Sequence, residues 1–295
     1  EWDTMQIILH TGAHYTDDDR LMKCLLRNKG DFAKRGIAVP GPGKYRKLLK
    51  DTFNALKDAP ASPDARDVLI DAMLDEEQAD RLILSNTHFF GAPRASVRQG
   101  VLYPMAAERI ATMRQLFPDD QVEVFMAIRN PASFLPAVFD HSPHDEFADF
   151  LGGIAPQDVL WSETLMRIRD AAPNVPITVW CNEDTPLLWA QIIRDLAGLE
   201  HGEKIVGGFD LLSEIMTREG MKRFRAYLKS HAVMSETQKR WVISAFLDKF
   251  AIEEKLEEEL DLPGWTDELV NEMTDIYDED VFTIQRLPGV QMITP

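Results

Sequence analysis

The chain contains little cysteine and no long apolar run. Only two of its 295 residues are cysteine, Cys24 and Cys181, too few for a disulfide framework or for a metal site built from cysteine ligands. We expect both thiols to fill small spaces in the core. No apolar stretch approaches the length of about 20 residues that a membrane-spanning helix needs. Residues 1–9 also lack the basic and long apolar segments of a signal peptide, so the sequence predicts a cytoplasmic protein.

Basic residues are also scarce. The chain has 32 lysine and arginine residues against 49 aspartate and glutamate residues, which gives a net charge of -17. Such an excess repels nucleic acids and anionic lipid surfaces unless the basic residues are gathered in one place. A hydrophobic fraction of 45% with 27% charged residues is enough for a sizeable core and argues against a disordered chain. We therefore predict a soluble globular protein without nucleic-acid or membrane partners, while the oligomeric state stays open.

Four short apolar segments have the composition of β-strands. They lie at Met5–Leu9, Arg81–Leu84, Val122–Ile128 and Ile177–Trp180, and helical patterns separate them. This alternation is typical of an α/β fold with a mostly parallel central sheet flanked by helices. The segment Val122–Ile128 is apolar at nearly every position, which predicts a central strand covered on both faces.

Helical spacing dominates after about Asp210. The periodic segments there are Met221–Leu228, Thr237–Phe250 and Asp267–Ile284, and the acidic run Glu253–Asp261 has the composition of a solvated helix face. No low-complexity linker or internal repeat divides the chain. We predict a single domain over residues 1–295, with an α/β core at about 1–209 and a helical C-terminal extension at about 210–295.

The turn after the first strand carries the most informative motif. Parallel sheets bind ligands at the carboxyl ends of their strands, where the first N–H groups of the next helix can face an anion. Residues 10–20 read His-Thr-Gly-Ala-His-Tyr-Thr-Asp-Asp-Asp-Arg and lead into a helix that we expect over Leu21–Arg35. This turn resembles the phosphosulfate-binding loop of sulfotransferases, above all a bacterial branch that reads His-x-Gly-x-His-Lys-Thr-Gly-Thr-Thr. The matching residues are His10, Gly12, His14 and Thr16.

The resemblance implies a fold similar to that of P-loop proteins and transfer of a sulfuryl group from 3′-phosphoadenosine 5′-phosphosulfate (PAPS) to a hydroxyl or amine. The acceptor class, whether a small molecule, a glycan or a lipid, stays open. Carried over by position, the resemblance assigns His14 to the catalytic site. It assigns the following residues to donor binding: Gly12, Ala13, Tyr15, Thr16, Arg20, Arg129 and Ser133.

The second match follows the expected central strand. Residues 128–131 read Ile-Arg-Asn-Pro and resemble the family's 3′-phosphate site, in which an arginine and a serine eight positions later bind the donor. Arg129 supplies the arginine, but Ala137 stands at the serine position, which leaves Ser133 as a hydroxyl that could reach the ligand instead. A purely structural interpretation also fits, because proline is favoured at the first position of a helix.

The third match is the polar turn after Arg81–Leu84. Thr87 and His88 stand where members of the family often carry a general base. Histidine titrates near neutral pH, so His88 could accept a proton from an acceptor hydroxyl. The alternative is a loop histidine whose hydrogen bonds are satisfied within the protein. Further segments similar to the bacterial branch lie at 179–184, 263–265, 277–280 and 287–290, so the resemblance covers most of the chain.

The first turn departs from the family pattern where the anion would bind. Tyr15 replaces the lysine that stabilises charge on the leaving oxygen, and Asp17–Asp19 replace Gly-Thr-Thr. Carboxylates suit the first turn of a helix, with Thr16 as the expected N-cap. We expect the chain's own carboxylates to occupy the anion site. Basic residues would offset this negative charge if they converge on the turn, and the candidates are Arg20, Lys23, Arg94 and Arg98.

Three functions remain open. The first is a working sulfotransferase that uses PAPS, with Arg129 at the 3′-phosphate and His88 as the base. The second is a catalytically inactive relative that binds a partner, a metabolite or a cation in a remodelled cleft. The third is a divalent-metal site formed by Asp17, Asp18 and Asp19 with His14, although adjacent aspartates at a helix start point in different directions.

Overall fold

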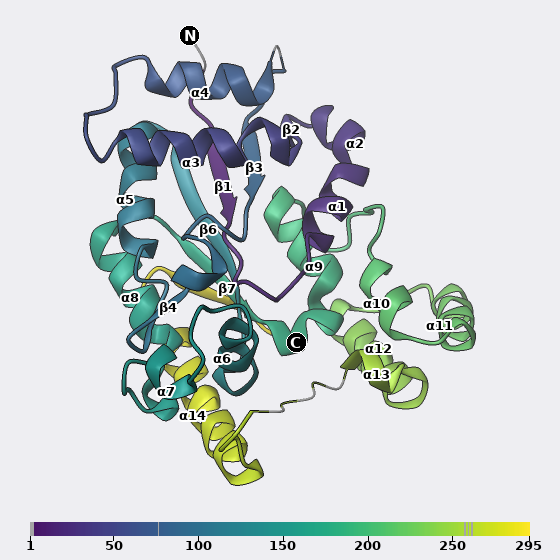
Figure 1. Ribbon diagram of the computed structural model, residues 1–295. Coiled ribbons are helices and arrows are strands. Elements are labelled where there is room, and N and C mark those ends of the chain that lie inside the picture. The colour runs from purple at the N-terminus through teal and green to yellow at the C-terminus, as the bar shows by residue number, and fades with distance from the viewer. Residues whose placement is uncertain (1–2, 76, 257, 259, 261) are drawn as a thin grey trace.

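A six-stranded, fully parallel sheet forms the centre of the protein (Figure 1). The computed structural model describes residues 3–75, 77–256, 258, 260 and 262–295. The strand order is β2-β3-β1-β6-β7-β8. The strands are β2 (Ile37–Ala38), β3 (Arg81–Ser85), β1 (Gln6–His10), β6 (Gln121–Ile128), β7 (Ile177–Cys181) and β8 (Val290–Ile293). The predicted α/β fold is confirmed, and all four segments expected to be strands belong to this one sheet.

The strand β6 is central, as its composition predicts. It lies between β1 and β7, with Leu9 opposite Val124 and Ile128 opposite Cys181. Its residues from Val124 to Ile128 are all buried, because parallel strands are covered by helices on both faces. The strands β1, β6 and β7 therefore end at the same edge of the sheet.

Helices lie on both sides of the sheet. In Figure 1, α5 (Ala106–Leu116) and α8 (Trp161–Ala171) lie on one side, and α1 (Arg20–Arg27) and α9 (Thr185–Ala197) lie on the other. The remaining α-helices are α2 (Lys29–Ala33), α3 (Arg46–Ala55), α4 (Ala65–Leu74), α6 (Pro131–Phe139), α7 (Phe147–Phe150), α10 (Asp210–Ile215), α11 (Arg218–Ser230), α12 (Glu236–Phe250), α13 (Glu253–Leu256) and α14 (Asp267–Gln285). Short 3-10 helices cover Pro42–Lys44, Pro93–Ala95, Pro156–Asp158 and Asn182–Asp184, and β4 (Val97–Arg98) pairs antiparallel with β5 (Val101–Leu102).

The helix expected over Leu21–Arg35 is interrupted at Asn28. Its side-chain amide donates to the carbonyl oxygens of Cys24 and Val206 at 2.9 and 2.8 Å, and its Oδ1 accepts from the N–H of Val206 at 2.8 Å. Asn28 thus ties the end of α1 to a distant loop. The chain then resumes as the short helix α2.

The C-terminal part is helical as predicted, with one exception. The expected helices correspond to α11, α12 and α14, but Val290–Ile293 forms β8 at the edge of the sheet, which the sequence analysis missed. In the acidic run Glu253–Asp261, α13 covers the first four residues and is exposed as predicted. Residues 257, 259 and 261 of that run lie outside the described residues. None of the helices in the described part of the chain combines the length and apolar composition of a membrane-spanning segment.

Candidate functional site

A cleft of about 510 Å³ lies at the carboxyl ends of β1, β6 and β7. Each of the three turns that follow these strands contributes polar side chains to its lining, as the α/β fold leads us to expect. Those on which the argument depends are Thr16, Arg20, Asn130, Ser133, Glu183 and Thr185. The turn after β1 and the turn after β6, which contains Arg129, are far apart in the sequence. Both therefore meet at one cleft.

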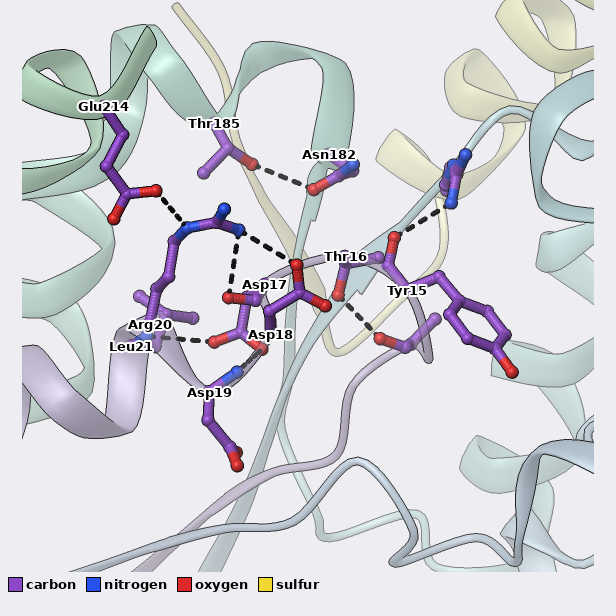
Figure 2. Close-up of polar contacts among 12 residues, drawn as sticks. Tyr15, Thr16, Asp17, Asp18, Asp19, Arg20, Leu21, Asn182, Thr185 and Glu214 are labelled. Atoms are coloured by element: carbon purple, nitrogen blue, oxygen red, sulfur yellow. Dashed lines mark hydrogen bonds and ion pairs between the residues drawn. The ribbon is translucent and has the colours of Figure 1, made fainter. Parts of the chain in front are cut away.

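The side chain of Asp17 occupies the start of α1. One carboxylate oxygen accepts from the N–H of Leu21 at 3.0 Å, and the other accepts from the N–H of Asp19 at 3.3 Å (Figure 2). Asp17 is 6% exposed. The first N–H groups of a helix are the donors that bind an anionic ligand in this class of fold. In this protein, the Asp17 carboxylate accepts from one of the first N–H groups of α1, that of Leu21, and from the N–H of Asp19, which directly precedes the helix.

The predicted N-cap at Thr16 is wrong. The helix begins at Arg20, and the hydroxyl of Thr16 donates to the carbonyl oxygen of Ala13 at 2.6 Å. Asp18 and Asp19 have φ angles of 48° and 59°, in the left-handed region that aspartate tolerates better than most residues. These two residues turn the chain once more before the helix starts, so the N-cap position falls on Asp19, and the Asp17 carboxylate accepts from the N–H of Leu21.

The three carboxylates of the turn diverge (Figure 2). Asp18 lies 3.4 Å from the guanidinium of Arg20, whereas Asp19 accepts from Arg46 at 2.8 and 3.3 Å. The hydrogen bond from Arg46 is the largest cause that lowers the pKa of Asp19. No group of three His, Cys, Asp or Glu side chains within the described residues could hold a metal ion. This geometry contradicts the hypothesis of a metal site formed by Asp17, Asp18 and Asp19.

One of the cations that pair with the turn was not among the candidates. Arg46, at the start of α3, forms the ion pair with Asp19, while Arg20 pairs with Asp18 and with Glu214. Lys23 contributes to the lowered pKa of Asp19 through its charge. The other two candidates, Arg94 and Arg98, form no hydrogen bond or ion pair with the three aspartates, all of which are described.

Tyr15 brings no positive charge to the lysine position. Its ring stacks on His141, with 5.0 Å between the ring centroids. Its φ angle is 58°, and burial raises the pKa of its hydroxyl. Tyr15 contributes to the site mainly through its carbonyl oxygen, which accepts from Arg129 at 2.9 Å.

The guanidinium of Arg129 connects three parts of the site. Besides Tyr15, it donates to Ser133 Oγ at 3.0 Å and to the carboxylate of Glu258 at 2.8 Å. Arg129 is 8% exposed, whereas the side chain of Glu258 is 47% exposed. Ser133 lies one helical turn after the arginine and supplies the hydroxyl that Ala137 lacks. The structural interpretation of this turn holds as well, since Pro131 begins α6 and the Asn130 side chain caps it.

Glu183 holds two strand ends together. It accepts from the N–H of Asn130 at 2.7 Å and from the hydroxyl of Tyr277 at 2.9 Å, and burial raises its pKa. These contacts join the turns after β6 and β7 to α14. The sequence analysis noted the segments 179–184 and 277–280 as similar to the bacterial branch but assigned Glu183 no role.

His14 and His88 lie beside each other next to the first turn, with their rings 5.0 Å apart. His14 is buried, and both its backbone N–H and its Nδ1 lie 2.8 Å from the hydroxyl of Tyr103. Burial and then the charge of His88 lower the pKa of His14 to about 3. His88 is exposed, and its pKa is also lowered, first by partial burial of the ring and next by Arg46. This lowered pKa favours the neutral ring of His88, which can accept a proton.

The solved structures that match the chain include a sulfotransferase domain from the curacin biosynthetic pathway, which is 12% identical, with a TM-score of 0.34 over 71% of this chain and 78% of that domain. No protein-family model and no curated protein matches the chain. A likeness with this identity and TM-score carries no argument about function, which has to come from the residues of the cleft.

Proposed function

We propose that this protein is a sulfotransferase-like binding protein that has kept the cleft and lost sulfuryl transfer. The observation that carries the proposal is the Asp17 carboxylate, which accepts the N–H groups of Leu21 and Asp19 at the start of α1. In the sulfotransferases that the turn resembles, this position binds the phosphosulfate group of PAPS. A fixed negative charge there repels the donor and competes for the same N–H groups.

The missing lysine supports the same proposal. Sulfuryl transfer leaves negative charge on the bridging oxygen of the donor, and a cation held at that oxygen lowers the barrier. Tyr15 stands at this position, and its ring stacks on His141 instead. The nearest arginines, Arg20 and Arg46, already pair with Asp18 and Asp19.

The Arg129 half of the cleft supports retained binding. Its buried guanidinium donates to Ser133 and to the half-exposed carboxylate of Glu258. An anionic group of a ligand could replace the Glu258 carboxylate at the Arg129 guanidinium, because the arginine would then exchange one negatively charged partner for another. We therefore propose a ligand with one anionic group at Arg129 and with polar groups near Asn130 and Thr185, which line the cleft.

A working sulfotransferase is the second candidate, and the position of His88 favours it. His88 is exposed and lies beside His14, and its lowered pKa favours the neutral ring, the form in which a histidine accepts a proton as a general base. In this alternative PAPS would bind with its 3′-phosphate at Arg129. The acceptor would be a small molecule, a glycan or a lipid.

Calorimetry with 3′-phosphoadenosine 5′-phosphate tests the proposal. We expect no binding by the wild type at millimolar ligand, because Asp17 opposes the 5′-phosphate. The double variant Tyr15→Lys/Asp17→Gly should bind at least about tenfold more tightly, since removing one adjacent like charge contributes at least about 1.4 kcal/mol. Asp18 and Asp19 stay unchanged because threonine is strained at their positive φ angles.

The matched control is Tyr15→Lys/Asp17→Asn. Asparagine removes the charge but keeps an oxygen that accepts from the helix N–H groups, so this variant should gain less affinity than the glycine variant. Thermal unfolding of each variant establishes that it is folded. Micromolar binding by the wild type, or sulfuryl transfer from PAPS to any phenol, alcohol or amine in a panel, would contradict the proposal and support the second candidate.

A further inference from the structure

The helix α11 presents a stripe of exposed basic residues. Arg218, Lys222, Arg225 and Lys229 follow each other at intervals of four, three and four residues, which places them on one face of the helix. All four are exposed, while Met221 and Phe224 on the other face are buried. None of the four forms an ion pair with a described residue, and Arg225 only reaches Ser213 Oγ at 3.5 Å. We call these four residues the basic stripe.

The helix α14 presents a stripe of opposite charge with the same spacing. Glu268, Glu272, Asp275 and Glu279 also follow each other at intervals of four, three and four residues, and all are exposed. The sequence of α14 contains no lysine or arginine. No described basic residue forms an ion pair with these four carboxylates, and Glu272 has only a 3.3 Å hydrogen bond from Gln157. We call these four residues the acidic stripe.

The two stripes lie in separate parts of the molecule. The helix α11 packs against α10 and α12, whereas α14 packs against α6, α8 and β8 (Figure 1). Each stripe extends over about 16 Å along its helix, at 1.5 Å per residue. The intervals read the same in both directions, so four charges face four opposite charges whether two such helices pack parallel or antiparallel.

We propose that the basic stripe of one copy docks against the acidic stripe of a second copy. This contact is heterologous, because a different surface of each copy takes part, and it can repeat from copy to copy. It is weak, since exposed ion pairs contribute little individually and the contact between two helix faces is small. The net charge of -17 opposes association at low salt. At 0.1 M salt, charges more than about 10 Å apart are screened and the facing charges dominate.

Sedimentation velocity from 10 µM to 1 mM protein tests the proposal. In 0.1 M NaCl the average mass should rise with concentration. In 1 M NaCl, where the screening length is about 3 Å, the association constant should fall at least about tenfold. The variants Lys222→Glu/Arg225→Glu and Glu272→Lys/Asp275→Lys should each remain monomeric, because the altered stripe then carries two charges of each sign and its two central charges repel the unaltered stripe of the other copy.

A mixture of these two variants provides the sharpest test. In the mixture, the two altered stripes match charge for charge, and so do the two unaltered stripes, so association should return although neither variant associates alone. The control for Lys222→Glu/Arg225→Glu is Lys57→Glu/Lys204→Glu, which lowers the net charge by the same amount at two exposed lysines outside α11. This control should associate like the wild type.

Several results would overturn the proposal. They are a wild type that is monomeric at 1 mM in 0.1 M NaCl, a loss of association in the Lys57→Glu/Lys204→Glu control, and a variant mixture that stays monomeric. Binding of the monomeric wild type to vesicles of phosphatidylcholine and phosphatidylserine, abolished by Lys222→Glu/Arg225→Glu, would assign the basic stripe to an anionic lipid surface instead.

Discussion

Asp120→Ala is expected to lower the free energy of unfolding by about 3–5 kcal/mol, the loss typical of removing one partner of a buried ion pair. The side chain of Asp120 is 0% exposed and that of Arg66 is 15% exposed. Two hydrogen bonds at 2.6 and 2.8 Å join them, and Asp120 also accepts from the N–H of Met5 at 2.9 Å. These contacts join α4 to the starts of β1 and β6, so the variant removes the buried carboxylate that pairs with Arg66 and that accepts from the N–H of Met5. Urea unfolding followed by circular dichroism measures the loss.

Asp67→Ala is the matched control for this experiment. Asp67 is a second partner of the same arginine, at 3.1 Å, but its side chain is 42% exposed. An exposed ion pair contributes less than about 1 kcal/mol. Equal losses in the two variants would show that burial does not control the contribution of the Arg66 pairs. Asp120 directly precedes β6, at the end of the strands opposite to the cleft. Neither variant should therefore change ligand binding in the cleft.

Lowering the pH from 7 to 4.5 is expected to destabilise the protein through His14. In the folded state the pKa of His14 is about 3 because the ring is buried, whereas in the unfolded state it returns to about 6.5. The unfolded state therefore binds the extra proton. The contribution of neutral His14 to stability is fully present above pH 6.5 and is lost as the pH falls toward 3. For one histidine the slope is at most about 1.4 kcal/mol per pH unit, or about 2–3 kcal/mol over this range.

His14→Gln separates this effect from other titrating groups. Burial raises the pKa of Glu183 and lowers that of His10, so the wild-type profile combines opposite contributions. Glutamine is uncharged at every pH, and the difference between the two profiles isolates His14. Urea unfolding at pH 7.0, 5.5 and 4.5 should give a flatter profile for the variant. Parallel profiles would contradict the prediction, because they would mean that His14 titrates alike in the folded and unfolded states.

The strands that the sequence predicted correctly are those in which the run of apolar residues reflects burial on both faces of the sheet. Three of the five residues of β1 and six of the eight residues of β6 are apolar, because helices cover both faces of the sheet. The strand β8 is an edge strand of four residues with only Ile293 buried, so its composition gave no comparable signal. The break at Asn28 depends on Val206, a residue far away in the sequence, and local helical spacing could not reveal it.

Only those parts of the candidate site that lie within one continuous sequence motif could be predicted from the sequence. The motif at residues 10–20 located the turn and the unusual aspartates, but it could not show which carboxylate would take the helix N–H groups. That choice depends on the left-handed conformations of Asp18 and Asp19. The partners Arg46, Tyr103 and Glu258 come from distant parts of the chain. Nothing in their own neighbourhoods indicates a role, because only the folded sheet brings them to the turn.

The position of β8 also affects how the protein folds during synthesis. Ile177 of β7 pairs with Val290, and the helices α9 to α14 lie between these strands in the sequence. Contacts between residues so distant in the chain form late. A ribosome that adds about 5–20 residues per second would thus leave one edge of β7 open for several seconds. During this time, its unpaired N–H and C=O groups can pair with a strand of another nascent chain, which makes this interval the most aggregation-prone stage of folding.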